Sequence, residues 1–152
     1  MRFLGHPLHP LLVHFPIAFW VLASLCDVLS ITGAGHSFGL SELGSLSGLF
    51  LLLGLGFALA AMMAGLMDLS DVPEQAQGDV NLHLLCMGGA WVAYLSALIT
   101  RLDGATWPLP LPGGLSVALS IIGLALLGVG GWYGGQLVYK HGTGVNTSSQ
   151  QK

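Results

Sequence analysis

Long apolar stretches separated by short polar segments dominate the pattern of hydrophobic and polar positions along the chain. The stretches 43–67 and 115–139 contain no charged residue, 82–100 contains one histidine near its start, and 11–31 is interrupted by a histidine and an aspartate. At a rise of ~1.5 Å per residue, helices of these lengths approach or exceed the ~30 Å thickness of a hydrocarbon core. We therefore predict four membrane-spanning helices.

Four spans leave only short connections, so we expect one membrane domain over residues 1–145, followed by a polar tail at 146–152. Four consecutive crossings predict an all-α, up-down-up-down four-helix transmembrane bundle with both termini on the same face. Composition supports a lipid environment, because only 7% of the residues are charged, whereas soluble domains usually carry about 25%. The net charge of −3 gives no indication of nucleic-acid binding.

Glycine and alanine recur at intervals of three or four residues on the second and fourth spans, as at Gly130 and Gly134. Such spacing lets membrane helices pack closely. Missing side chains also leave room beside a helix for a flat cofactor. The pattern leaves both interpretations open, and it leaves homo-oligomer formation open as well.

Basic residues are few and unevenly placed. Arg2, Lys140 and Lys152 belong to the face that carries the termini, and Arg101 belongs to the opposite face. Because cytoplasmic segments of membrane proteins are enriched in Lys and Arg, this distribution predicts cytoplasmic termini. On the opposite side, Asp27 and Arg101 are expected to pair with each other.

Histidines gather at the terminal face of the predicted bundle. Most of them precede, begin or follow a span on that side, and Asp68 ends the second span there. The histidines concerned are His6, His9, His14, His83 and His141. Ionisable groups are costly inside membranes and usually mark functional sites. Since every span brings a potential ligand to the same end, we predict a cofactor or metal site at that end.

Haem b is the first candidate for this site. Bis-histidine ligation needs two neutral imidazoles from facing helices of a bundle. We predict His14 and His83 as the axial ligands, with His9 or His141 serving a second haem or its propionates. The protein would then be an electron carrier rather than an enzyme, working with a redox partner protein or a quinone.

Two alternatives use the same side chains. A copper, iron or zinc ion suits nitrogen and oxygen ligands of this kind, and the candidate set is His6, His9, His14, His83, His141 and Asp68. Without a bound metal, the histidines and Asp68 would form a proton or quinone relay. Soret absorption, metal without Soret absorption, or neither would distinguish the three hypotheses.

Several short motifs stand at these positions: Gly5-His6-Pro7-Leu8-His9-Pro10, His14-Phe15-Pro16, Gly65 to Asp68, His83, and Gly134 to Val145. Together they resemble the motifs of a bacterial family catalogued as domain of unknown function 2231. The resemblance covers nearly the whole chain and implies a four-span protein of the bacterial inner membrane. Association of relatives with iron–sulfur or cytochrome modules would imply electron transfer.

Overall fold

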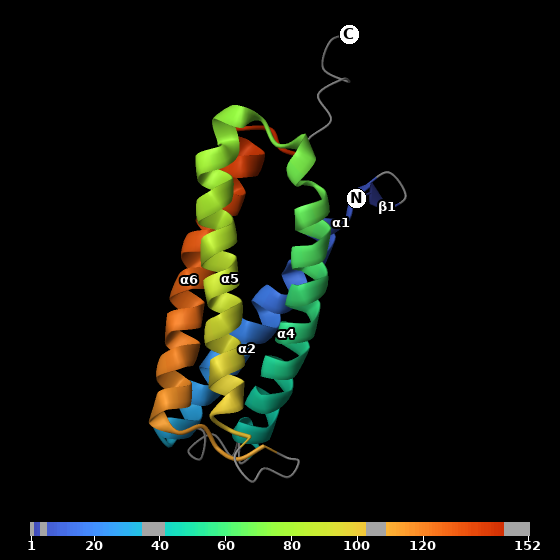
Figure 1. The fold of residues 1–152 in the computed structure, drawn as a ribbon. Coiled ribbons are helices and arrows are strands. Elements are labelled where there is room, and N and C mark those ends of the chain that lie inside the picture. Colours follow the sequence, from blue (N-terminus) through green and yellow to red (C-terminus); the bar gives the residue numbers. More distant parts are fainter. Residues whose placement is uncertain (1, 4–5, 35–41, 103–108, 145–152) are drawn as a thin grey trace.

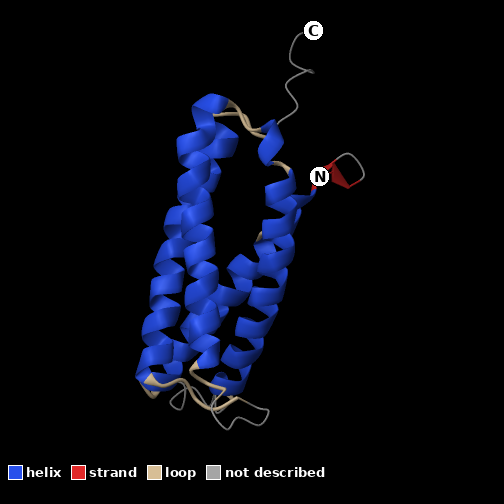
Figure 2. Cartoon of the chain, in the orientation of Figure 1, coloured by secondary structure: helices blue, strands red, loops and turns tan. Residues whose placement is uncertain are grey.

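The structure, a computed structural model, describes residues 2–3, 6–34, 42–102 and 109–144. Its main elements are the helices α1 (Leu8–Leu12), α2 (His14–Ile31), α4 (Leu43–Met67), α5 (Gln77–Ile99) and α6 (Gly114–Tyr139) (Figure 1). Helix accounts for most of the described backbone (Figure 2). The short elements are the 3-10 helices η1 (Leu69–Asp71) and η2 (Glu74–Ala76), and the antiparallel strands β1 (Arg2–Phe3) and β2 (His6–Pro7).

The four-span bundle expected from the hydropathy pattern is confirmed. The helical stretches that are long and apolar enough to cross a membrane are Leu8–Ile31, Leu43–Met67, Glu74–Ile99 and Gly114–Tyr139. Successive helices alternate in direction, so β1 and the end of α6 lie at the same end of the bundle (Figure 1). The third helix begins at Gln77 rather than at Leu82, because hydropathy marks only the apolar part of a helix whose first turns are polar.

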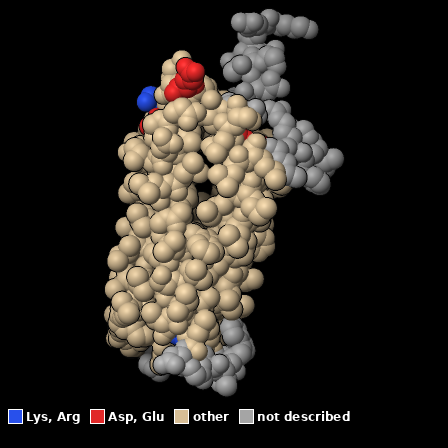
Figure 3. Space-filling model, viewed as in Figure 1, with Lys and Arg blue, Asp and Glu red and all other residues tan. Residues whose placement is uncertain are grey.

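The helices associate as two pairs. Helix α2 packs along α4, α5 packs along α6, and α2 also contacts α6. The outer surface of this bundle is apolar, with Leu85 72% exposed and Leu115 65% exposed. In the space-filling view, charged side chains lie toward the ends of the bundle and leave a wide uncharged belt between them (Figure 3). An apolar belt of this kind is compatible with lipid rather than water as the surrounding solvent.

The first span is interrupted near its start by Pro16. Helix α1 ends at Leu12, Val13 separates it from α2, and backbone hydrogen bonds continue on both sides of Val13. Proline has no N–H group, so Pro16 cannot donate to the carbonyl of Leu12 four residues earlier. Pro10 removes no helical hydrogen bond, because it lies in the first turn of α1, where N–H groups have no intrahelical acceptor.

Glycines on the helices make room for aromatic rings in the core. Trp20 and Tyr94 stack with ring centroids 4.6 Å apart and planes 15° apart. A Cβ atom at Gly123 would lie 2.7 Å from Cε2 of Tyr94, and one at Gly54 would collide with the Trp20 indole. At these two positions the glycine pattern therefore serves packing.

Candidate histidine site

His9 of α1 and His83 of α5 form a pair at the end of the bundle that carries β1. Their ring centroids are 6.3 Å apart and their planes are at 89° to each other. Both side chains are half-buried. The pair therefore joins the first and third spans, which are far apart in the sequence.

A backbone carbonyl of a neighbouring helix fixes each of these rings. Nδ1 of His9 lies 2.7 Å from the carbonyl oxygen of Ala61 in α4, and Nδ1 of His83 lies 2.8 Å from that of Gly130 in α6. A carbonyl only accepts hydrogen bonds, so each Nδ1 carries the hydrogen and Nε2 of the neutral ring keeps its lone pair. No described residue hydrogen-bonds to either Nε2. Both rings are thus oriented as metal-ligating histidines usually are.

Two glycines allow the imidazoles to lie against the helix backbones. A Cβ atom at Gly65 would be 2.9 Å from Nδ1 of His9, and a Cβ atom at Gly134 would be 3.1 Å from Cε1 of His83. A side chain at Gly65 would push the His9 ring away from the carbonyl that holds it, whereas one at Gly134 would require the His83 ring to shift by a few tenths of an ångström. The glycine stripes of α4 and α6 therefore shape this site as well as the core.

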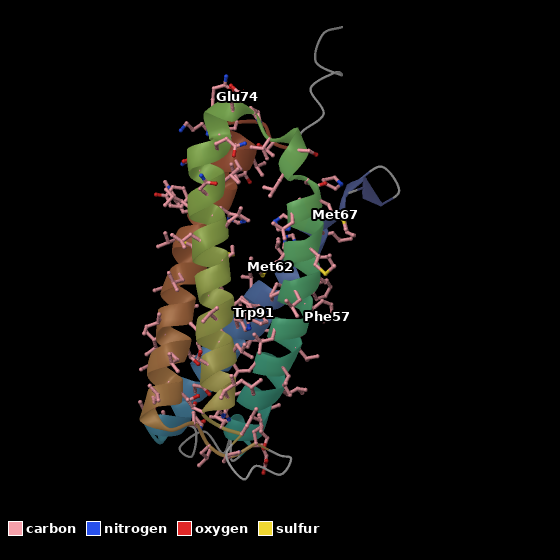
Figure 4. The ribbon with its side chains drawn as sticks, viewed as in Figure 1. Phe57, Met62, Met67, Glu74 and Trp91 are labelled. Atoms are coloured by element: carbon pink, nitrogen blue, oxygen red, sulfur yellow. The ribbon has the colours of Figure 1, made fainter. Side chains whose placement is uncertain are left out.

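A narrow opening lies between α4 and α5 in the half of the bundle nearer η2 (Figure 3). Figure 4 labels Met62 between these helices at the lower part of the opening, with Trp91 below it. Nε1 of Trp91 donates a 3.4 Å hydrogen bond to the carbonyl of Leu55, which links α5 to α4 beneath the opening. Since Ala61, the hydrogen-bond partner of His9, precedes Met62, the histidine pair belongs to the half of the bundle with the opening.

His14, predicted from the sequence as the partner of His83, lies elsewhere. It is exposed on the first turn of α2, and the ring beside His83 is that of His9. Five positions separate His9 and His14, which corresponds to ~140° around a helix at ~100° per residue. The two histidines therefore cannot share one face.

The remaining predicted ligands are distributed around the same end. Nε2 of His141 lies 2.8 Å from Oδ2 of Asp79, and Nζ of Lys140 lies 3.5 Å from the same oxygen. Asp68 is half-buried and caps the C-terminal end of α4. His6 belongs to β2, but its side chain lies outside the described part of the structure.

Asp79 is a residue of this end that the sequence interpretation did not single out. It precedes His83 by four positions on α5, a spacing that places two side chains on the same helix face. This four-residue spacing from His83 is the sequence signal that could have identified Asp79. Its contacts with Lys140 and His141 connect the start of α5 to the end of α6.

Few potential metal ligands lie close together among the described residues. Among them, no three His, Cys, Asp or Glu side chains come close enough to share a metal ion. Protein sites for zinc normally use three or four protein ligands. The histidine pair offers two nitrogens, which is the number that an iron porphyrin needs at its axial positions.

At the opposite end of the bundle, Asp27 and Arg101 form the ion pair expected from the sequence. Nη1 of Arg101 lies 3.1 Å from Oδ1 of Asp27, and both side chains are fully buried. Ser47 and Ser120 donate hydrogen bonds to the Asp27 carboxylate. Burial lowers the pKa of Arg101, although the Asp27 carboxylate opposes this shift, and the guanidinium remains charged.

The fold and its two polar sites define a four-span helical membrane protein with a paired-histidine site at one end. The chain belongs to the family described as predicted membrane protein (DUF2231), which matches residues 5–147. This assignment confirms the resemblance seen in the sequence motifs. The comparisons with curated proteins and with solved structures found no significant match to the chain.

Proposed function

We propose that this protein binds haem b between His9 and His83 and carries electrons within a membrane. Two features of the pair support the proposal. Both imidazoles keep an Nε2 lone pair, because their Nδ1 atoms donate to backbone carbonyls. They also come from different helices of a bundle, as axial ligands of bundle cytochromes do.

The spacing of the two rings carries the proposal. Metal–nitrogen bonds to imidazole are ~2.0–2.1 Å long. The centre of a five-membered ring with bonds of ~1.35 Å lies ~1.15 Å behind its nitrogen. Two imidazoles on opposite sides of one metal ion therefore have centroids about 6.4 Å apart. The observed separation of His9 and His83 is 6.3 Å.

A haem suits this pair better than a bare copper, iron or zinc ion. The porphyrin supplies four nitrogens of its own, so two histidines complete the coordination of its iron. A bare zinc ion would need at least one further protein ligand near His9 and His83, and the described residues offer no third His, Cys, Asp or Glu there. The number of donors therefore favours haem.

Backbone carbonyls and apolar side chains of the protein would adjust the redox potential of a bound haem. Haem would supply one-electron redox chemistry. The carbonyls of Ala61 and Gly130 polarise the two imidazoles through Nδ1 and make Nε2 more basic, which favours the more positively charged oxidised state of a ligated metal. Apolar neighbours on α4 and α5, such as Met62 and Trp91, limit the access of water.

We further propose that the protein resides in a bacterial inner membrane with its termini and histidine pair on the cytoplasmic side. Arg101 is buried and paired with Asp27, so it does not act as a free loop charge. The other basic residues that the structure describes, Arg2 and Lys140, both belong to the terminal face. By the positive-inside rule this face is cytoplasmic. Reporter fusions at the C-terminus and in the 103–108 connection would test this orientation.

A reduced-minus-oxidised optical spectrum of the purified full chain, with metal analysis of the same sample, tests the proposed function. The expected result is a b-type spectrum with about one haem per chain. A colourless protein that carries copper, iron or zinc would show that the site binds a bare ion instead of haem. A colourless protein without metal would overturn metal-based electron transfer altogether and favour the relay.

A further inference from the structure

The two histidines of the pair belong to different groups of packed helices. His9 lies on α1, which packs against α4, and its ring is held by the carbonyl of Ala61 in α4. His83 lies on α5, and its ring is held by the carbonyl of Gly130 in α6. We call α1, α2 and α4 the first arm, and α5 and α6 the second arm. Each ring is therefore fixed within its own arm, and the pair faces across the boundary between the arms.

At the end of the bundle opposite the histidines, polar side chains join the two arms. Arg101, which follows α5, pairs with Asp27 of α2 and donates to the hydroxyl of Ser47 in α4. Ser120 of α6 donates a 2.8 Å hydrogen bond to the Asp27 carboxylate. All four side chains are buried. This end is therefore fixed by a buried hydrogen-bond network that spans both arms.

Contacts between the arms reach the middle of the bundle. The ring of Trp20 in α2 stacks on that of Tyr94 in α5. One level nearer the histidines, Nε1 of Trp91 in α5 donates a 3.4 Å hydrogen bond to the carbonyl of Leu55 in α4. Beyond that level an opening separates α4 from α5 (Figure 3). The connection between the arms is thus strong at one end and interrupted near the other.

A bilayer does not close such an opening as water would. Acyl chains are as apolar as the helix surface, so no hydrophobic driving force brings membrane helices together, and their association depends on packing and hydrogen bonds. Regions with few buried contacts open locally at low cost in free energy. The histidine end of the two arms is such a region, because α4 and α5 are separated there by the opening (Figure 3).

We infer that the two arms form a clamp, which opens between α4 and α5 at the histidine end and is held closed by a ligand bound to both histidines. That this ligand is haem rests on the proposed function. A ligand shifts a conformational equilibrium only by its difference in affinity for the two states. A ligand that needs both His9 and His83 binds at the observed ring spacing of 6.3 Å and loses one donor when the arms separate. It therefore favours the closed state, while the Arg101 network keeps the other end fixed.

Distances between spin labels on the two arms test the clamp, measured by double electron–electron resonance on the full chain in lipid nanodiscs. Met63→Cys and Leu85→Cys place labels at exposed positions of α4 and α5 near the level of the histidine pair. Cys26→Ala and Cys86→Ala remove the two buried native thiols. Cobalt(III) protoporphyrin is the probe, because its six-coordinate cobalt takes two axial nitrogens and is diamagnetic, so it does not disturb the labels.

Leu46→Cys with Ile99→Cys is the matched control pair, since both residues are exposed on the same two helices at the anchored end. Without porphyrin, the Met63–Leu85 distances should be broadly distributed and the control distances narrowly distributed. With porphyrin, the Met63–Leu85 distribution should narrow to the width of the control, which should not change. In His9→Ala, the Met63–Leu85 distribution should stay broad when porphyrin is added.

These outcomes separate the clamp from the proposed function. A ligand-free Met63–Leu85 distribution as narrow as the control would overturn the clamp, whether or not the protein binds haem. Equal breadth at both ends would also overturn it, because the whole bundle would then be loose. Haem binding without any narrowing would refute the clamp and leave the proposed function standing. Narrowing by the cobalt porphyrin in a protein that is purified without haem would support the clamp and remove haem as its natural ligand.

Discussion

Arg101 and Asp27 form a buried ion pair, with Nη1 3.1 Å from Oδ1, at the end of the bundle opposite the histidine pair. Nη2 of Arg101 also donates to the carbonyls of Gly44 and Pro110, at 2.7 and 2.8 Å. The guanidinium therefore connects α5 to α2, to the start of α4 and to the segment before α6. This end of the protein serves as a structural anchor, whereas the other end offers ligand nitrogens.

Arg101→Met should lower the free energy of unfolding by about 3–5 kcal/mol, because it leaves the Asp27 carboxylate buried without its partner. The double variant Asp27→Leu/Arg101→Met removes both charges and should recover a large part of that loss. Thermal unfolding of the purified protein in detergent, followed by circular dichroism, measures both changes. The single variant Asp27→Leu completes the comparison. If the double variant loses as much unfolding free energy as the two single variants lose in total, the charges do not interact.

His9→Ala and His83→Ala should each abolish the b-type spectrum, since each removes one of two axial ligands. His14→Ala is the matched control, because His14 is exposed and lies outside the pair. Haem content per chain is measured from the pyridine haemochrome of each purified variant. Loss of haem in His14→Ala with retention in His9→Ala would instead support the pairing of His14 with His83 that the sequence suggested.

Gly65→Ala should weaken haem binding, because the new Cβ atom would lie 2.9 Å from Nδ1 of His9 and push the ring out of position. Overpacking of this kind costs about 1–3 kcal/mol, which corresponds to about 5- to 150-fold in affinity. Gly56→Ala on the same helix meets open space and should leave affinity unchanged. Haem titration of the apoprotein compares the two variants, and equal affinities would contradict a role for Gly65 in positioning His9.

Gly123→Ala should destabilise the bundle without removing either polar site, because its Cβ atom would lie 2.7 Å from the Tyr94 ring. A loss of about 1–3 kcal/mol is expected from overpacking. Gly128→Ala faces open space and should instead stabilise the helix by up to about 1 kcal/mol. Opposite shifts in melting temperature would confirm the distinction, and equal shifts would refute it.

Sequence alone determined the number of spans and the end at which the histidines gather. Both follow from local hydropathy, because an apolar stretch long enough to cross a bilayer becomes a span and successive spans must alternate in direction. The same reasoning paired Asp27 with Arg101, since two opposite charges assigned to the same end of a bundle have few other partners. None of these conclusions requires knowledge of how a helix is rotated.

Only the tertiary structure decided how each helix is rotated about its own axis. The spans are apolar nearly all round, so the sequence shows no polar face that would indicate which side points inward. Packing of Trp20 on Gly54 and of Tyr94 on Gly123 sets the rotation, and with it the glycines that face the histidines and those that face lipid. His9 rather than His14 lies beside His83, because five positions turn a helix by about 140° and place the two histidines on different faces of the first span.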